Sequence, residues 1–547
     1  MMISCPTTAS VVVDYALEGP RTAAAVAVGK SRLLGMTYQV GDCQPQFVAD
    51  NLAAVIRSFG DRPRIYPDSL FGLAVEMQHD LPSPAAFDDI GVMLRLLEEP
   101  PPPELAEQKP GRSDRASLLD ASAARVCRIM ALYPSLAARI ASEGLEGVYR
   151  PIELPVIAPT LAMTLSGIGI DTAVLDRIAE GTRVQMEIAK RQVAELAGRS
   201  INLDSSAEVA RYLYAELGLP AVAYTRSGAI STAAAALEPL ADAHPAVQSL
   251  LKYQANKPVH NAAAALRSHV QPGSQRVHAD LDPLGTSTGR FSCRDPNLQA
   301  LPSPLLAAVV ALPGNVLLEA DFSQCELRIL AHFSRDARLL HAYQADGDLH
   351  RQTAAAVLQI PPHRVTAKDR QRYGKQINFA VIYGMTAEGL AQNVGLTVVE
   401  AQAVLDAYFN AYPGVRQWID EEVHNSVQAC GHVRTLYQRR RQLPAIWSAA
   451  PQETAEAQRQ AVNTIIQGTA ADLMKLALIR LHERLPVVAR LLLTVHDSVL
   501  LEVPEHLVEQ TKRDVVDAMQ VIPPGFRVPL KVDCGVGRTW VECKMSH

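Results

Sequence analysis

The sequence predicts an α/β protein of several domains. Its 547 residues give room for three to four domains at the usual span of about 150 residues each. The first part alternates segments typical of strands and of helices, whereas from about residue 150 onward the apolar residues recur mainly at helical spacing. These observations predict a small N-terminal α/β unit followed by a larger body rich in helices.

The composition limits the classes of function. Lys and Arg total 52 against 57 for Asp and Glu, a net charge of −5, so a nucleic acid would have to bind a local basic surface. The eight cysteines include no CxxC pair, which argues against a zinc module or a disulfide scaffold and favours the cytoplasm. No run of 18 apolar residues occurs, so we expect no contact with membranes.

The first 150 residues supply the elements of the α/β unit. The segments 10–14 and 23–28 read as strands, and the segment around 47–59 reads as a helix. Four consecutive prolines within 98–104 favour extended backbone, so this stretch is expected to be a stiff loop.

Beyond residue 150 the helical signals become stronger. The segment 175–197 carries apolar residues at spacings of three and four among Arg, Glu and Lys, which predicts an amphipathic helix with one solvated face. The segment 202–206 then supplies a turn and an N-cap for a helix that continues to residue 217.

Two apolar strands carry an aspartate where they end. In the segment 315–330 an apolar strand leads into Asp321, and a helix starting at Glu326 follows. In the segment 491–503 two apolar halves flank His496 and Asp497, as in a β-hairpin. Each aspartate alone is compatible with an ordinary turn or N-cap. Together they offer the paired carboxylates that two-metal phosphoryl transfer needs.

A third segment, 370–384, reads RQRYGKQINFAVIYG. At about 100° per residue, Lys375, Phe379 and Tyr383 share one face of a helix, and Arg372 falls in the same stripe. Cations can bind a triphosphate, while aromatic rings can stack on a base or crowd a sugar. This face is therefore a candidate nucleotide site.

These segments resemble motifs A, B and C of the family A DNA polymerases, the DNA polymerase I type. The resemblance rests on DFSQCELR at 321–328, on the Lys375 to Gly384 helix and on VHD at 495–497. Further similar stretches are TGRFS at 288–292, DPNLQ at 295–299, DLHR at 348–351, YPGV at 412–415 and QGTAAD at 467–472. The resemblance covers about residues 150–547.

The resemblance implies a right-hand polymerase fold, with an antiparallel palm sheet and helical fingers and thumb. The N-terminal unit would be an RNase H-like α/β domain of the exonuclease type. The implied domains are residues 1–150 for the exonuclease-like unit, 151–305 for the thumb and the start of the palm, 306–345 for the palm with motif A, 346–425 for the fingers with motif B, and 426–547 for the palm with motif C.

The implied activity is that of a template-directed DNA polymerase, a nucleotidyltransferase that adds dNTPs to a primer 3′-hydroxyl. Asp321 and Asp497 would bind two Mg²⁺ ions, with Mn²⁺ as an alternative, and Glu326 would exclude a ribose 2′-hydroxyl. The dNTP contacts would come from Arg372, Lys375, Phe379, Tyr383, Glu326, Gln324 and His350. The primer-template contacts would come from Arg290, Arg459, Asn463, Gln467 and His496. The resemblance implies a monomer that acts on DNA in the cytoplasm of a bacterial or phage-infected cell.

Two positions depart from the family pattern. The family has an arginine four residues before the motif B lysine, where this chain has Gln371 between Arg370 and Arg372. The family also follows the motif C His-Asp with glutamate, where this chain has Ser498. Because both aspartates are present, we expect polymerisation to persist, with weaker triphosphate affinity and an altered metal dependence.

The N-terminal unit resembles, more weakly, the 3′–5′ exonuclease domain that precedes this polymerase core. Asp14, Asp68 and Asp120 occupy the positions of its carboxylates, but Ala16 replaces a glutamate and Ala116 a tyrosine. Two-metal hydrolysis needs its bridging ligands and a group that orients the water. We therefore expect a degenerate exonuclease site and no proofreading.

Two alternatives remain open from the sequence. The first is a protein that binds primer-template without catalysis, since Gln371 and Ser498 could mark a decayed site. The second is a 3′–5′ exonuclease with residual activity through the three N-terminal aspartates.

Overall fold

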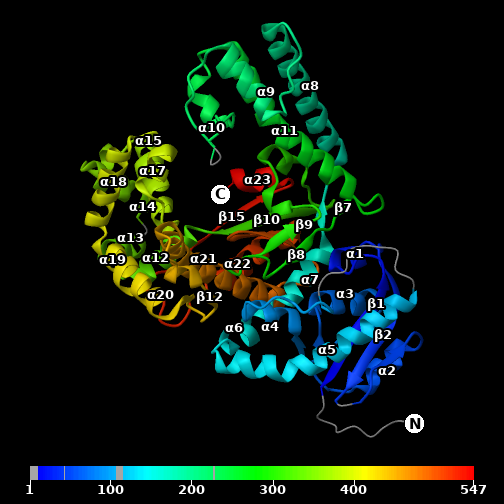
Figure 1. The fold of residues 1–547 in the computed structure, drawn as a ribbon. Helices are drawn as coiled ribbons and strands as arrows, with labels where there is room; N and C mark the ends of the chain where they lie inside the picture. Colours follow the sequence, from blue (N-terminus) through cyan, green and yellow to red (C-terminus); the bar gives the residue numbers. More distant parts are fainter. Residues whose placement is uncertain (1–9, 42, 106–114, 226–227, 346, 547) are drawn as a thin grey trace.

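The structure is a computed structural model that describes residues 10–41, 43–105, 115–225, 228–345 and 347–546. An N-terminal α/β unit lies beside a larger body, in which helices rise on two sides of a central sheet (Figure 1). No helix of the described ranges is both long enough and apolar enough to cross a membrane.

The N-terminal unit is built on a five-stranded sheet of order β3-β2-β1-β4-β5. The central strand β1, Val11–Glu18, pairs antiparallel with β2, Arg32–Val40, and parallel with β4, Arg64–Tyr66. All of β1 except Glu18 is buried, as expected for a strand covered on both faces. The remaining elements are α1 (Ala23–Ala27), β3 (Gln46–Val48), α2 (Leu52–Ser58), α3 (Ser69–Gln78), β5 (Phe87–Asp89), α4 (Ile90–Leu96) and α5 (Arg115–Ser142).

Two predictions for this unit need correction. The segment 23–28 was expected to be a strand, but it forms α1 because its alanines favour helix and Thr22 caps its first turn by accepting from the Ala25 N–H. The helix expected at 47–59 begins only at Leu52, since Gln46–Val48 pairs with β2 and Asn51 has a φ of 60°. The described part of the proline-rich stretch is a loop, as predicted.

One segment joins the two parts of the molecule. It contains α6 (Glu146–Val148), the π-helical turn η1 (Tyr149–Glu153) and α7 (Ile157–Ser166). Helix α7 contacts α1 and α3 of the N-terminal unit, and it also contacts β13 and α21 of the larger body. The N-terminal unit is therefore packed directly against the body.

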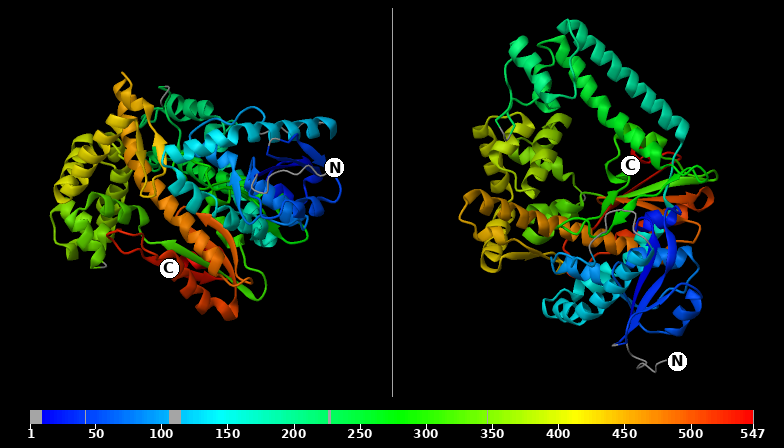
Figure 2. Two further views of the ribbon diagram at one scale, coloured as in Figure 1. Left: turned by 90° about the horizontal axis from the view of Figure 1, so that it is seen from below. Right: turned by 45° about the vertical axis from the view of Figure 1, so that its right-hand side comes forward.

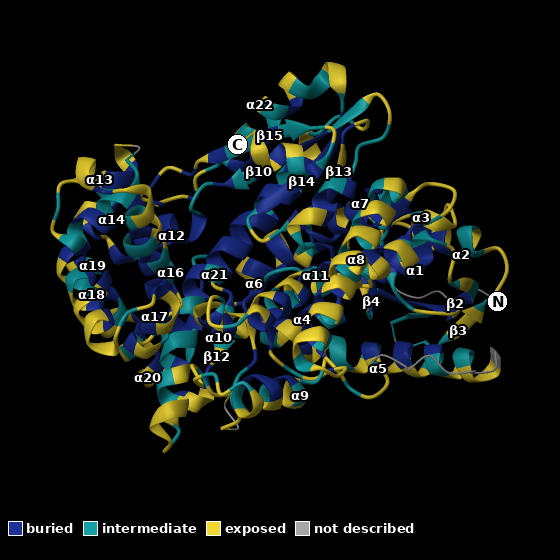
Figure 3. Ribbon diagram, turned by 90° about the horizontal axis from the view of Figure 1, so that it is seen from above, coloured by how far each residue is buried: buried dark blue, intermediate teal, exposed yellow. Residues whose placement is uncertain are grey.

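The central sheet of the body has four antiparallel strands in the order β13-β14-β10-β15. The strands are β10 (Asn315–Phe322), β13 (Arg490–Val495), β14 (Ser498–Pro504) and β15 (Val532–Gly537). The C-terminal segment that supplies β13, β14 and β15 also contains three helices: α21 (Pro451–Arg484), α22 (Val508–Met519) and α23 (Trp540–Met545). In Figure 3 the buried residues concentrate around this sheet and α21.

Two long helices, α8 (Thr172–Ala197) and α11 (Pro245–His269), pack side by side and extend away from the sheet (Figures 1 and 2). The predicted amphipathic helix is α8, which buries Leu175, Met186, Ala189 and Val193. The predicted N-cap is Ser205, which starts a helix that continues to Glu216. The tip of this region contains α9 (Ser206–Ala210), the π-helical η2 (Arg211–Glu216), α10 (Ala234–Leu237) and η3 (Glu238–Leu240).

A group of helices forms the opposite side of the body (Figure 1). It contains α12 (Cys325–Ser334), α13 (Ala337–Gln344), α14 (Leu349–Leu358), η6 (Pro362–Arg364), α15 (Ala367–Asp369), η7 (Arg370–Lys375), α16 (Gln376–Ile382), α17 (Ala387–Val394), α18 (Val398–Ala411), α19 (Pro413–Gln417), η8 (Trp418–His424) and α20 (Asn425–Cys430). Short elements complete the body: β6 (Ile168–Gly169), β7 (Arg276–Val277), β8 (Asp280–Asp282), β9 (Ser292–Arg294), η4 (Leu298–Ala300), η5 (Ser303–Ala308), β11 (His432–Arg434), β12 (Arg440–Gln442), η9 (Pro444–Trp447) and η10 (Glu505–Leu507).

Candidate active site

Of the two aspartates singled out from the sequence, one lies near the end of a strand and the other lies in the turn just before the neighbouring strand. Asp321 is the penultimate residue of β10, and it stands opposite Ser498, the first residue of β14. Asp497 belongs to the two-residue turn between β13 and β14, in which His496 has a φ of 54°. The backbone N–H of Phe322 donates to the Asp497 carbonyl oxygen at 3.0 Å. The sheet register therefore brings the two carboxylates together.

The surroundings of these carboxylates carry excess negative charge. Burial, Asp497 and Glu319 raise the pKa of Asp321 to about 7. Burial also raises the pKa of Asp497, although its own backbone N–H and the nearby Arg290 act to lower it. Clustered carboxylate oxygens are the hard donors that divalent cations such as Mg²⁺ prefer. Among the described residues, however, no set of three or more Asp, Glu, His or Cys is arranged to hold a metal ion.

A further buried carboxylate, Glu319, lies next to Ser498. The Glu319 side chain is almost fully buried, and its Oε1 accepts from Lys544 Nζ at 2.8 Å and lies 3.4 Å from Ser498 Oγ. Glu319 stands two residues before Asp321 on the same face of β10. Sequence reasoning missed both Glu319 and Lys544, but the alternation along the strand was a signal that could have found Glu319.

Four residues from distant segments meet near Asp497. Arg290 Nη2 donates to the buried Glu326 carboxylate at the start of α12. Burial and the charge of Glu326 raise the pKa of Tyr383, while Arg290 and Gln467 of α21 act to lower it. Arg290 and His496 also line one small cavity. The structure thus brings Arg290, Glu326, Tyr383 and Gln467 into one cluster.

Helix α21 presents the other predicted DNA contacts. Arg459, Asn463 and Gln467 are partly buried and follow one another at a spacing of four residues, on one face of the helix. Gly384, with a φ of 58°, allows the chain after α16 to approach this face, since a Cβ there would lie 2.8 Å from Arg459 Cγ. The motif B segment and α21 are therefore in direct contact.

The motif B face differs in one respect from its prediction. Lys375 is exposed, and the Phe379 ring centroid lies 6.3 Å from that of His350. Arg372, however, donates to the carbonyl oxygens of Val394 and Gly395 at the end of α17. The expected stripe assumed regular α-helical spacing, but Arg370–Lys375 forms the π-helical turn η7, so the face shared by its residues changes.

Gln324 is the N-cap residue of α12 and has a φ of 54°. Its Oε1 accepts a hydrogen bond from the Tyr343 hydroxyl at 3.1 Å. The Gln324 side chain, two residues before Glu326, thus connects the start of α12 to α13.

The N-terminal aspartates are not arranged as a metal site. Asp14 is buried and accepts from Arg21 Nη2 at 2.5 Å, Arg125 Nη2 at 2.8 Å and Ser122 Oγ at 2.6 Å. Although burial acts to raise it, the pKa of Asp14 is lowered by these two arginines. Asp68 caps α3 through the Phe71 N–H at 3.1 Å, and Asp120 is exposed on α5. Sequence reasoning missed Arg21 and Arg125, for which the sequence carries no local signal.

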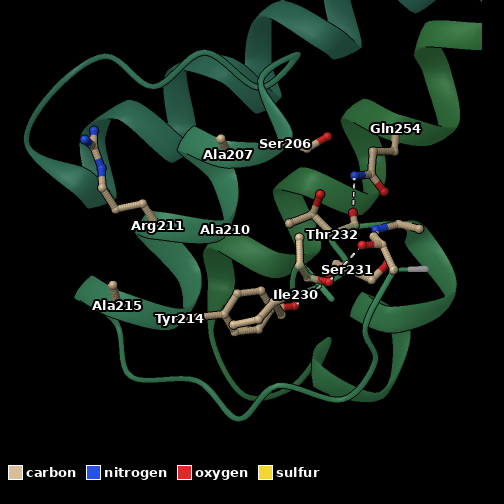
Figure 4. Close-up of a pocket in the computed structure, with 13 residues that line it drawn as sticks. Ser206, Ala207, Ala210, Arg211, Tyr214, Ala215, Ile230, Ser231, Thr232 and Gln254 are labelled. Atoms are coloured by element: carbon tan, nitrogen blue, oxygen red, sulfur yellow. Dashed lines mark hydrogen bonds between the residues drawn. The ribbon is translucent and has the colours of Figure 1, made fainter. Parts of the chain in front are cut away.

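Another cavity among the described residues, of about 940 Å³, lies at the tip of the α8 and α11 pair (Figures 1 and 4). Its wall is mainly apolar and contains no acidic residue. Gln254 donates to the Thr232 carbonyl and Tyr214 to the Ser231 carbonyl, at 2.8 and 2.9 Å. Because neither a carboxylate nor a histidine lines it, this cavity is a poor candidate for catalysis.

Comparisons with known proteins identify the family. A family model for DNA polymerase family A matches residues 172–542. The thermostable DNA polymerase I of Thermus filiformis is 40% identical over 424 residues, which cover 76% of this chain and 50% of that protein. DNA polymerase I of Geobacillus stearothermophilus is 36% identical over 442 residues, which cover 79% of this chain and 50% of that protein. The chain thus spans about half the length of these relatives.

The solved structure of the POL domain of Pol1 from M. smegmatis, described as a complex with DNA primer-template and dNTP, is similar over 98% of this chain and 96% of that chain. The TM-score is 0.87 and the sequence identity 26%. This similarity confirms the predicted right-hand polymerase fold with an N-terminal α/β unit. On the sequence match and the shared fold, the chain belongs to DNA polymerase family A.

Proposed function

We propose that this protein is a template-directed DNA polymerase that transfers the nucleotidyl group of a dNTP to a primer 3′-hydroxyl. The observation that carries the proposal is the proximity of Asp321, near the end of β10, to Asp497, in the turn just before the adjacent strand β14, in a setting of excess negative charge. Family membership supports it, as does the similar Pol1 domain, which was solved with primer-template and dNTP. The proposal includes a monomer as the active form.

Asp321 and Asp497 would bind two divalent ions, Mg²⁺ with Mn²⁺ as an alternative. Their carboxylate oxygens fit such ions. Burial raises the pKa of Asp321, and so do the charges of Asp497 and Glu319, which a bound cation would offset. When bound, the ions lower the pKa of the primer hydroxyl and stabilise the transferring phosphoryl group. Water and phosphate oxygens would supply the other oxygen ligands of these ions.

The incoming nucleotide would lie against the motif B face. Lys375 offers an exposed ammonium to the triphosphate, with His350 beside it. Phe379 and Tyr383 would pack near the sugar and the templating base, and Tyr383 is half-exposed as such a contact requires. Glu326 would exclude the 2′-hydroxyl of an rNTP, and Gln324 would hold the helix start that positions it.

Primer-template would be bound by Arg290 and His496 near the carboxylates and by the Arg459, Asn463 and Gln467 face of α21. These groups can contact phosphates, sugars and the minor groove without selecting a sequence. In this proposal residues 151–305 form the thumb and the start of the palm, residues 346–425 the fingers, and residues 306–345 and 426–547 the palm.

The N-terminal unit, residues 1–150, would act as a scaffold and would not proofread. A carboxylate that binds metal must be free of competing cations, whereas Asp14 is held by two arginines. Asp120, unlike the buried Asp14, is exposed on α5.

The test is extension of a labelled primer on a longer template with Mg²⁺ and dNTPs, by wild type and by Asp497→Ala. The matched control is Asp406→Ala, an exposed aspartate on α18 that accepts from Gln402. We expect extension by wild type and by the control but not by Asp497→Ala. DNA binding without extension by wild type would refute the proposal in favour of a binding protein. Degradation of the primer 3′ end that is lost on Asp68→Ala would refute the absence of proofreading.

A further inference from the structure

The chain lacks the arginine that its family has four residues before the motif B lysine. Gln371 occupies this position, and Arg370 and Arg372 flank it. In a regular α-helix, Arg372 would be the one that shares a face with Lys375. The structure instead has a π-helical turn over Arg370–Lys375. Such a turn pairs residues five positions apart, so Arg370 lies one turn before Lys375.

The two arginines have different partners. Arg372 Nε and Nη2 donate to the Val394 and Gly395 carbonyl oxygens at 2.9 and 3.0 Å, and its guanidinium also lies over the Tyr373 ring. These carbonyls end α17, where a helix leaves acceptors without internal partners. Arg372 is thus engaged as a cap of α17.

The side chain of Arg370 contacts the N-cap residue of α14, Asp348. Its Nε donates to Asp348 Oδ2 at 2.7 Å, while Oδ1 of the same carboxylate caps α14 through the Arg351 N–H. The two terminal guanidinium nitrogens of Arg370 make no hydrogen bond to any residue that the structure describes. Asp348 therefore orients the side chain through one nitrogen and leaves the two others as donors.

The turn and the start of α14 are closely packed around His350. Gly374 permits this contact, since a Cβ there would lie 2.0 Å from the His350 carbonyl oxygen. His350 Nδ1 lies 3.0 Å from Asn378 Nδ2. An amide nitrogen can only donate, so the neutral imidazole carries its proton on Nε2. Burial and the charges of Arg370 and Lys375, against the opposing effect of Asp348, together lower the pKa of His350 to about 4. Both cations therefore lie near the same imidazole.

We propose that Arg370 is a triphosphate-binding residue of this polymerase, acting with Lys375 and His350, and that Arg372 is a structural cap. This inference rests on the proposed function and concerns the same nucleotide site. The guanidinium of Arg370 supplies the two-donor fork that matches phosphate oxygens, and it replaces the family arginine from a position one residue earlier.

The experiment measures dNTP binding separately from chemistry. Wild type, Arg370→Ala, Arg370→Lys, Arg372→Ala and Asp348→Asn are titrated with the complementary dNTP on a primer-template whose primer ends in a dideoxynucleotide. The KM and kcat for a single incorporation on an extendable primer are measured in parallel. Arg416→Ala is the control, because Arg416 also pairs with an aspartate, at 3.0 Å, but lies on α19.

We expect Arg370→Ala to weaken dNTP binding and raise KM by about 10- to 100-fold, the usual effect of losing hydrogen bonds to a charged group, with unchanged primer-template affinity. Arg370→Lys should recover part of the loss, because it restores the charge but not the fork. Asp348→Asn should have a smaller effect, since the cation remains. Arg416→Ala should behave as wild type.

Two results would overturn the inference: weakened dNTP binding in Arg372→Ala with normal binding in Arg370→Ala, or equal effects of Arg370→Ala and Asp348→Asn, which would make the ion pair merely structural. The proposed function fails differently, by absence of extension in wild type, and the dNTP titration still reports on Arg370 in that case.

Discussion

The strongest test of how the two parts of the molecule are joined is the substitution Glu153→Gln. Glu153 is fully buried in η1, and its Oε1 accepts from Lys475 Nζ at 2.6 Å and from Arg439 Nη2. Lys475 is itself fully buried on α21. Although burial acts to raise it, the pKa of Glu153 is lowered by Arg439 and Lys475. The carboxylate is therefore ionised, and its negative charge balances the positive charges of the buried Arg439 and Lys475.

The loss of stability depends on which of the two cations is left without a carboxylate partner. Breaking a buried ion pair destabilises proteins by about 3–5 kcal/mol. Arg439 keeps Asp472, which accepts from its Nε at 2.9 Å and its Nη2 at 2.6 Å, so only Lys475 is orphaned. We therefore expect the free energy of unfolding to fall by about 3 kcal/mol, the lower end of this range. A cooperative unit of about 400 residues has an unfolding entropy near 0.8 kcal/mol/K, which converts this loss to a fall of about 4 °C in Tm.

The assay is differential scanning calorimetry at pH 7 with a matched control. Glu180→Gln breaks an exposed i,i+3 pair with Arg183 and should leave the Tm unchanged, since such pairs are screened by solvent. The double variant Glu153→Gln/Lys475→Met should regain part of the lost stability, because it removes the orphaned ammonium. A Tm for Glu153→Gln within 1 °C of the control, about 0.8 kcal/mol on the same scale, would refute the reasoning.

Four other outcomes are expected. Glu326→Ala should keep dNTP extension but raise the relative use of rNTPs by about 10- to 100-fold, measured as the ratio of the two kcat/KM values; an unchanged ratio would contradict its role as the sugar gate. Ser498→Glu should shift the Mg²⁺ and Mn²⁺ titrations of extension, because it adds a carboxylate beside Glu319; identical curves would argue against a metal effect of this position. Burial and the nearby Arg527 lower the pKa of His332 to about 4, so between about pH 4 and 6.5 the unfolded state binds the extra proton and stability rises with pH. Urea unfolding of wild type and His332→Phe across this range should give a shallower pH slope for the variant. Primer-template affinity should fall with salt as phosphate contacts release counterions, and a flat dependence would exclude the basic surface proposed around Arg290 and Arg459.

The elements that place the aspartates were predictable because their signals are local. Apolar runs that end in Asp321 and in His496-Asp497 favour buried strands, and the structure has β10, β13 and β14 there. The segment 23–28 shows the limit of such reasoning. Its apolar character is compatible with a strand or a buried helix, and only the Thr22 cap and the alanine content decide for the helix.

The partners of the charged residues were less accessible. A helical wheel presumes one spacing, so it could not show that η7 separates Arg372 from Lys375. The neutralisation of Asp14 depends on Arg125, more than a hundred positions away, and no local pattern reports it. The alternation along β10 places Glu319 on the same face as Asp321, but the contact of Glu319 with Ser498 depends on the pairing of two strands, which no local pattern reports.

The shared register of β10 and β14 has a consequence for how this protein can change in length. Asp321 is placed beside Ser498 by the pairing of β10 with β14. A single residue inserted within β10 would therefore turn the Asp321 carboxylate to the opposite face of the sheet. Length changes are therefore excluded from these strands. The turn between α8 and α9, by contrast, belongs to a region that contributes no strand to this sheet. Residues 198–200 of this turn are exposed, so a tag or domain inserted there would leave the spacing of the two aspartates intact.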